Sequence, residues 1–159
     1  MEFDMSEYYL ERYFGWSEYM SNEFWSKYYK LALECTRPLP GAKEIISELK
    51  DMGVKVYLIT ARKEKFKELT INWLNHHQLP FDKLIMTSEK ATSCAENNID
   101  IMVEDEPENC KSIAACSKVL CMSYKYNEDL EGYKNIIRVS SWDEIYNIVL
   151  QYIDVEDVV

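Results

Sequence analysis

From Pro40 onward, the chain alternates short apolar runs with segments of helical periodicity. The clearest run covers residues 54–59, is almost wholly β-branched or aliphatic, and follows Gly53, which is a helix-terminating signal. Strands separated by helices of this size predict an α/β domain with a parallel sheet. The predicted strands are 54–59, 84–86, 100–103, 119–122 and 136–139, and the predicted helices are 42–52, 63–77, 91–98, 107–115 and 142–152.

The first 35 residues have a different character, because they are rich in aromatic side chains. Residues 17–35 contain neither Pro nor Gly, and apolar groups recur there at helical spacing, which predicts an amphipathic helix. Such an aromatic stripe more often packs as a helical face than lines a ligand pocket. Residues 37–41, Arg-Pro-Leu-Pro-Gly, then end the helix and are typical of a hinge or linker.

Composition limits the possible partners and location. A chain of 159 residues is most simply one domain, and its net charge of -10 disfavours binding to nucleic-acid polymers or anionic membranes. No apolar run approaches the length needed to cross a bilayer. The start, Met1-Glu2-Phe3-Asp4, lacks the basic and apolar parts of a secretory signal, so we expect a cytoplasmic protein.

The cysteines and histidines do not form a recognisable metal or disulfide pattern. An odd count without a Cys-x-x-Cys pair disfavours a disulfide framework or structural zinc, and we expect buried free thiols. Adjacent His76 and His77 point about 100° apart on a helix and cannot easily share one metal ion. The cysteines are Cys35, Cys94, Cys110, Cys116 and Cys121.

Groups able to bind phosphate or metal follow two of the predicted strands. Thr60 follows the first strand, and Glu104 and Asp105 follow the strand at 100–103, at the sheet edge where ligands bind in parallel α/β folds. A hydroxyl can hold a phosphate oxygen, two carboxylates can hold Mg²⁺, and Lys90, at the start of a helix, can neutralise a phosphate. Each residue taken singly is better explained as a helix cap or a surface group; together, in this order, they favour a site.

These segments resemble the second, third and fourth motifs of the haloacid dehalogenase superfamily. The matching residues are Leu58-Ile59-Thr60-Ala61-Arg62, then Lys90, then Ile101-Met102-Val103-Glu104-Asp105-Glu106-Pro107-Glu108-Asn109. The closer similarity is to the branch of 5′-deoxyribonucleotidases and their bacterial nucleotidase relatives. The resemblance implies a HAD-like Rossmannoid parallel sheet flanked by helices, with a partial helical cap over residues 1–37 and an α/β core over residues 38–159.

The resemblance also implies roles for individual residues. Thr60, with Ala61 and Arg62, would hold the phosphoryl oxygens, and Lys90 would be catalytic by stabilising the charge of the nucleophile and of the transferring phosphoryl group. Asp105, together with Glu104, would bind Mg²⁺. Phosphoryl transfer depends on such positioning and electrostatic stabilisation.

One family element is missing from the sequence. The family's first motif is a strand that ends in Asp-x-Asp and supplies the nucleophile, and these 159 residues contain no Asp-x-Asp at the end of an apolar strand. Asp4-Met5-Ser6 is no substitute, because only three residues precede it. In this superfamily that strand lies between the strands ending in Thr60 and in Glu104-Asp105, so its absence would expose two inner edges. Either these strands pair directly, or another segment or a second chain fills the gap, or a shortened chain folds poorly.

Three functional hypotheses follow from the sequence. The first is an Mg²⁺-dependent phosphohydrolase acting on a nucleoside monophosphate or similar small phosphate ester, impaired where the nucleophile is absent. The second is a catalytically inactive phosphate- or nucleotide-binding or regulatory module. The third is a shortened remnant without activity of its own. The open strand edges and the aromatic helix also favour association into a homo-oligomer.

Overall fold

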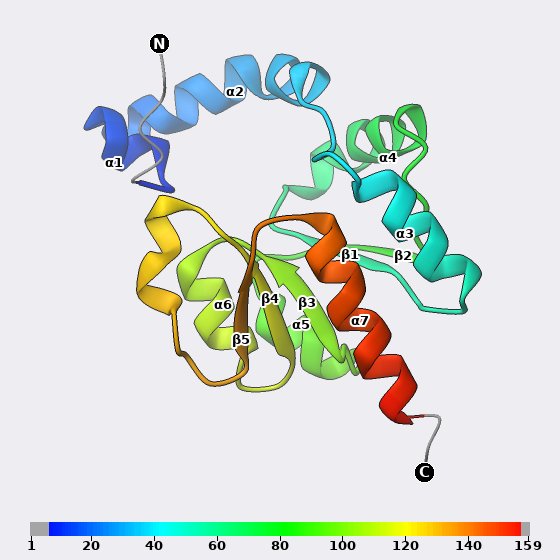
Figure 1. Ribbon diagram of the computed structural model, residues 1–159. Coiled ribbons are helices and arrows are strands. Elements are labelled where there is room, and N and C mark those ends of the chain that lie inside the picture. Colours follow the sequence, from blue (N-terminus) through cyan, green and yellow to red (C-terminus); the bar gives the residue numbers. More distant parts are fainter. Residues whose placement is uncertain (1–6, 157–159) are drawn as a thin grey trace.

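The computed structural model describes residues 7–156, so the predictions that concern Met1–Asp4 and Asp4-Met5-Ser6 lie outside the described residues. Short strands alternate with helices from α3 onward, as predicted (Figure 1). The helices are α1 (Leu10–Phe14), α2 (Glu18–Cys35), α3 (Ala42–Asp51), η1 (Glu64–Phe66), α4 (Lys67–His76), α5 (Lys90–Glu96), α6 (Pro107–Ile113), η2 (Lys125–Leu130) and α7 (Trp142–Glu156). The strands are β1 (Tyr57–Thr60), β2 (Lys83–Met86), β3 (Ile101–Glu104), β4 (Lys118–Met122) and β5 (Ile136–Val139).

The strands form two separate parallel sheets. One sheet pairs β1 with β2, aligning Tyr57 with Lys83 and Thr60 with Met86. The other has the order β3-β4-β5. The predicted α/β fold with parallel strands is therefore confirmed. Within residues 7–156, β1 and β3 do not pair with each other, so direct pairing, one of the three outcomes considered above, does not occur.

Strand β4 is the central strand of the three-stranded sheet. It has a neighbouring strand on each side, and its residues Val119, Leu120 and Cys121 have no exposed surface. Leu120 packs on one face of the sheet with Ile145 of α7, and Val119 packs on the other with Ile113 of α6. Figure 1 shows α7 in front of this sheet and α5 and α6 behind it. Burial on both faces explains why this strand reads as a continuous apolar run.

The β1–β2 sheet is less enclosed. In β1 only Ile59 is buried, and in β2 no residue is. Ile59 and the partly buried Ile85 pack against the same core cluster as Cys94 of α5. The two sheets therefore share a hydrophobic core although their strands are not hydrogen-bonded.

Helix α2 lies apart from both sheets, at the top of Figure 1. Its start is fixed by Ser17, whose Oγ accepts a hydrogen bond from the Met20 amide. Its inner face contacts the β1–β2 half, because the Tyr29 ring stacks on Phe66 with centroids 4.0 Å apart. The amphipathic helix predicted for residues 17–35 is thus confirmed, and its aromatic face is at least partly a packing surface.

Several predicted boundaries were wrong, and two of the differences have a clear physical description. The strand predicted from residue 54 begins only at Tyr57, because the amides of Val54 and Val56 bond instead to the Leu49 carbonyl and the Asp82 carboxylate. The helix predicted over 63–77 is interrupted at Phe66, where a short 3₁₀ turn meets α4.

The cysteine prediction was partly wrong. Cys94, Cys110 and Cys121 are buried free thiols, whereas Cys35 and Cys116 are exposed. Cys35 is the last residue of α2, and Cys116 lies in the turn between α6 and β4. Among residues 7–156, no helix combines the length and apolar character needed to cross a bilayer.

Candidate functional site

A buried ion pair joins two of the predicted site residues. Lys90 begins α5 and Glu104 ends β3, and Lys90 Nζ lies 2.6 Å from Glu104 Oε2. Their side chains are only 13% and 3% exposed, so both charges are largely removed from water. The Glu106 amide donates a further hydrogen bond of 3.2 Å to Glu104 Oε1. Both oxygens of the buried carboxylate therefore have a partner, as a charge in this environment requires.

Asp105 lies next to this pair and has a different partner. The hydroxyl of Tyr126 donates a hydrogen bond of 2.6 Å to Asp105 Oδ2. Burial raises the pKa of Asp105, and the Tyr126 hydrogen bond partly opposes that rise. Burial and then the hydrogen bond to Asp105 raise the pKa of Tyr126, so the phenol stays protonated and donates.

The backbone at Asp105 is anchored by a buried asparagine. Asn127 Nδ2 donates to the carbonyl of Asp105 at 2.9 Å and to that of Met122 at 2.8 Å. Its Oδ1 accepts from Arg138 Nη2 of β5 at 3.2 Å. Because Asn127 is only 1% exposed, these bonds fix the loop after β3 to the end of β4 and to β5.

The segment before α1 is tied to the same region. Glu106 caps α6 by accepting hydrogen bonds from the amides of Glu108 and Asn109, and its Oε1 also accepts one from the Tyr9 hydroxyl at 3.0 Å. Beside it, the ring of Tyr8 meets that of Tyr126 edge-on, with centroids 5.4 Å apart. The amino-terminal segment therefore covers one side of the Asp105 region.

Thr60, Ala61 and Arg62 lie at the carboxyl end of β1, in the other sheet. The Arg62 amide donates to Thr60 Oγ1 at 3.4 Å, and Arg62 Nη1 donates to Thr70 Oγ1 at 3.3 Å. The backbone carbonyl of Thr60 accepts from the Thr87 amide just beyond β2. Helix α5, which begins with Lys90, packs against both β1 and α6, so it connects this turn to the region of Glu104 and Asp105.

Several residues of this region were not identified from the sequence. They are Tyr8, Tyr9, Tyr126, Asn127 and Arg138. Tyr126 and Asn127 follow β4 at its carboxyl end. Because ligands bind beyond the carboxyl ends of parallel strands, these two residues could have been identified in the same way as Thr60 and Asp105. Nothing in the sequence signals Tyr8 or Tyr9, since the Tyr9–Glu106 contact joins positions 97 apart.

Glu104 and Asp105 are adjacent carboxylates at the carboxyl end of β3. Carboxylate oxygens are preferred ligands of Mg²⁺, which usually keeps several waters and needs only one or two protein carboxylates. Among residues 7–156, no cluster of three or more His, Cys, Asp or Glu side chains could hold a metal ion. Two carboxylates are within what Mg²⁺ needs when water and substrate oxygens complete its coordination, and are too few for a closed structural metal site.

The chain is also similar to known proteins in sequence. The family model "5′ nucleotidase, deoxy (Pyrimidine), cytosolic type C protein" matches residues 9–153, which include nearly all of the region described above. No solved structure matches the chain significantly.

Three curated bacterial proteins are similar to the chain. A nucleotidase of Clostridium acetobutylicum is 31% identical over 93% of this chain and 78% of its own length. A protein of Chlorobaculum tepidum, provisionally named a 5′(3′)-deoxyribonucleotidase, is 27% identical over 72% of this chain and 56% of its own length. A protein of Halalkalibacterium halodurans, provisionally named a nucleotidase, is 28% identical over 89% of this chain and 73% of its own length. With a family model covering most of its length and parallel strands flanked by helices, the chain belongs to the cytosolic type C 5′-nucleotidases, a HAD-like nucleotidase family.

Proposed function

We propose that this chain carries the phosphate- and metal-binding part of a Mg²⁺-dependent phosphomonoesterase site for nucleoside monophosphates. The observation that carries the proposal is the buried Lys90–Glu104 pair beside Asp105, at the carboxyl end of a parallel strand. Family membership supports the reaction class, because the matched family and the similar proteins are named as nucleotidases.

Lys90 would stabilise negative charge on the phosphoryl group. Its ammonium is held by the Glu104 carboxylate and is largely screened from water, so its orientation is fixed before a substrate arrives. A fixed charge in a poorly hydrated site interacts more strongly with a developing oxyanion than the same charge in water does.

Asp105 and Glu104 would hold Mg²⁺, which when bound would neutralise phosphoryl oxygens and orient them. The pKa of Asp105 is raised because its carboxylate is partly buried, and a nearby cation would favour its ionised form. Tyr126 would keep one oxygen of Asp105 oriented by its hydrogen bond.

Thr60, Ala61 and Arg62 would bind the phosphate from the β1 side. The turn after β1 already directs the Arg62 amide toward Thr60 Oγ1, and a hydroxyl with neighbouring amides is a suitable set of phosphate donors. Helix α5 supports this placement because it contacts β1 and also supplies Lys90.

A second candidate function is binding without turnover. The observation that favours it is the lack of a strand ending in Asp-x-Asp among these 159 residues, because covalent phosphoryl transfer in the superfamily that this chain resembles uses that motif. Turnover would then require a nucleophile from outside these residues, while phosphate and Mg²⁺ could still bind to those present.

The proposal extends to domain organisation and location. Residues 1–37 would form part of a helical cap and residues 38–159 the core; the position of α2, away from both sheets, supports this division (Figure 1). The description of the matched family as cytosolic supports a cytoplasmic location.

The test is hydrolysis and binding of a panel of nucleoside monophosphates with Mg²⁺. Under the phosphohydrolase proposal, Asp105→Ala lowers turnover at least about a hundredfold. Glu108→Gln is the matched control, since Glu108 is a nearby carboxylate that pairs with Lys111 on the surface. We expect it to leave turnover unchanged.

The outcomes separate the two candidates. Turnover that Asp105→Ala abolishes and Glu108→Gln retains supports the phosphohydrolase. Mg²⁺-dependent nucleotide binding without turnover, measured calorimetrically, supports the binding module. A folded chain that neither binds nor hydrolyses any member of the panel would contradict both.

A further inference from the structure

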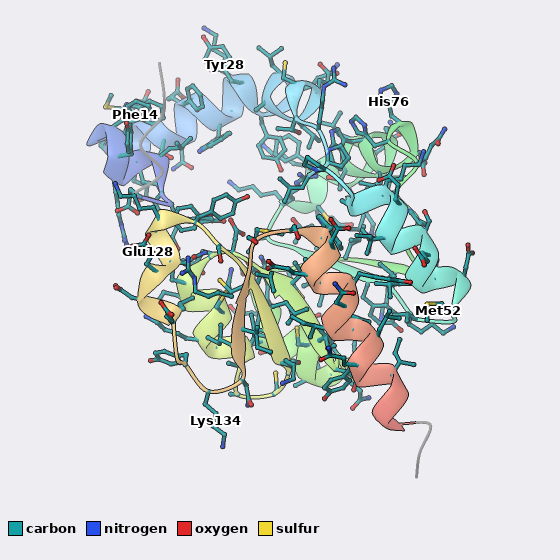
Figure 2. All side chains as sticks on the ribbon, viewed as in Figure 1. Phe14, Tyr28, Met52, His76, Glu128 and Lys134 are labelled. Carbon is teal, nitrogen blue, oxygen red and sulfur yellow. The ribbon has the colours of Figure 1, made fainter. Side chains whose placement is uncertain are left out.

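The outer face of α2 carries an apolar stripe that the described part of the chain leaves largely open. Phe24, Tyr28, Leu31 and Cys35 follow one another at spacings of four, three and four residues, and with Ala32 they line an apolar hollow of about 340 Å³. Leu31 is 56% exposed and Tyr28 is 39% exposed, so the stripe presents apolar surface to solvent. Figure 2 shows Tyr28 directed away from the rest of the molecule.

The stripe is distinct from the face that packs inward. Leu33, on the opposite side of α2, is buried, and Tyr29 stacks on Phe66 of the β1–β2 half. The amphipathic pattern of a helix that packs on one side requires only one apolar face. Helix α2 has two. The second is covered at its start by Trp16, whose ring centroid lies 4.9 Å from that of Phe24, whereas Tyr28, Leu31 and Cys35 are exposed.

The spacing of the stripe is that of a coiled-coil seam. Alternating steps of three and four residues place Tyr28 and Cys35 at one core position of the heptad, and Phe24 and Leu31 at the other. Lys27 and Glu34, both exposed, then flank the seam on one side, and Trp25 and Ala32 flank it on the other. These flanking residues determine which partner and which orientation the seam accepts.

The flanking residues are complementary to a second copy of the same helix in the antiparallel orientation. When Tyr28 of one copy packs on Leu31 of the other, Phe24 packs on Cys35, and the two-fold axis lies between residues 29 and 30. In that register Lys27 of each copy faces Glu34 of the other, which gives two symmetric ion pairs. Trp25 correspondingly faces Ala32, a large residue against a small one.

The parallel orientation lacks this complementarity. In a parallel pair, a residue on one side of the seam faces a residue from the other side of the partner's seam. Lys27 would then lie against Ala32 of the second copy, and its charge would be unpaired. In a single copy, Glu34 lies 3.7 Å from Lys30 in an exposed pair, which costs little to rearrange.

We propose that α2 is a dimerisation helix through which two copies of this chain associate in antiparallel fashion along Phe24, Tyr28, Leu31 and Cys35. The seam that the two copies share covers residues 24–35, about 18 Å or three turns of helix. So short an interface is weak and reversible, and the dimer therefore depends on protein concentration.

The first test is a charge exchange on the full chain, followed by sedimentation equilibrium. Lys27→Glu sets a carboxylate against Glu34 at both symmetric contacts and raises the dimer dissociation constant about tenfold at low salt. Glu34→Lys sets two ammonium groups against each other and has the same effect, and the double variant Lys27→Glu/Glu34→Lys restores association. Both side chains are exposed, so the fold, checked by circular dichroism, is unaffected; Lys111→Glu on α6 serves as a surface-charge control.

The second test fixes the orientation by cross-linking. In a background with exposed Cys116 changed to Ser, Phe24→Cys forms a disulfide with the native Cys35 of the second copy under mild oxidation. Within one helix these positions are about 16 Å apart and cannot be bridged. Leu31→Cys, which faces Tyr28 rather than Cys35, is the matched control that does not cross-link.

Three outcomes would overturn the proposal. One is a chain that stays monomeric up to about 500 μM, since even a weak interface populates dimers at that concentration. Another is a dimer that all the charge variants on α2 leave unchanged, which assigns association to a different surface. The third is a Cys35–Cys35 disulfide in the parent chain, which indicates a parallel pair.

Discussion

The two sheets of this molecule are built from similar strand sequences but differ greatly in burial. In β4, four of five residues are buried, whereas in β1 one of four is buried and in β2 none. Within residues 7–156, strand β4 has hydrogen-bonded neighbours on both sides, and β1 has one neighbour. An apolar run in the sequence therefore specifies a strand. The number of strands paired with that strand decides how much it contributes to stability.

The candidate site draws on both halves. Lys90, Glu104 and Asp105 belong to the well-packed half, in which their polar contacts are largely shielded from water. Thr60 and Arg62 belong to the open half. We therefore expect substitutions in the two halves to differ in their effect on stability.

The largest expected effect is truncation of a central leucine. Leu120→Ala in β4 lowers the free energy of unfolding by about 3 to 4 kcal/mol, because a fully buried side chain leaves a cavity. Leu58→Ala in β1 removes the same atoms from a half-buried position and costs about 1 to 2 kcal/mol. Urea unfolding measures both values, and equal losses would contradict the comparison.

A second contrast concerns ion pairs. Lys90→Met leaves the Glu104 carboxylate buried without its cation and costs about 3 kcal/mol. The double variant Lys90→Met/Glu104→Gln recovers most of that loss, because no charge remains buried. In the open half, Lys67→Met breaks the exposed pair with Glu64 and costs at most about 0.5 kcal/mol. A double variant as unstable as Lys90→Met alone would show that the charge is not the cause.

The hydrogen bond between Tyr126 and Asp105 gives a smaller effect. Tyr126→Phe removes a donor to a partly buried carboxylate and lowers the free energy of unfolding by about 1.5 kcal/mol. It also raises the pKa of Asp105 further, since the hydrogen bond favours the ionised form. Carbon-detected NMR titration follows that pKa, and Tyr133→Phe, at an exposed position, is the control expected to change neither quantity.

The smallest predicted effect is a pH dependence that belongs to Asp105. Its pKa is raised above the ordinary 3.8, so in the folded state it holds a proton that the unfolded chain has already lost. Stability due to this group therefore falls as the pH rises from about 3.8 through the folded-state pKa. Asp105→Asn removes that slope, so the variant gains stability relative to the parent as the pH rises. A difference that stays constant with pH, or falls, would show that the pKa is not raised.

Much of the fold was predictable because its signals are local. Gly53 follows the end of α3, the apolar run before Thr60 forms β1, and Pro107 stands in the first turn of α6. The positions of Thr60, Lys90, Glu104 and Asp105 at element ends could be inferred in the same way. None of these inferences required knowledge of which elements lie side by side.

The remaining features depend on contacts between distant segments. Lys90 and Glu104 were both predicted to be site residues, but the sequence did not indicate that their side chains form an ion pair. The bonds of Tyr126 to Asp105 and of Tyr9 to Glu106 depend on how η2 and the amino-terminal segment fold back. The separation into two sheets likewise could not be predicted from the sequence. The residues of a strand do not reveal whether its edge is paired with another strand.

Helix α7 has a consequence for the order in which the protein folds during synthesis. Helix α7 contacts α3: Tyr146 donates a hydrogen bond to Glu48, and Trp142 lies against the positive-φ turn at Gly41, with its Cβ 3.4 Å from the position a Gly41 Cβ would take. The Tyr146–Glu48 bond connects residues 98 positions apart, so during synthesis α3 emerges from the ribosome long before its partner. Until α7 arrives, that face of α3 lacks its partner, so the contact between α3 and α7 forms late in synthesis.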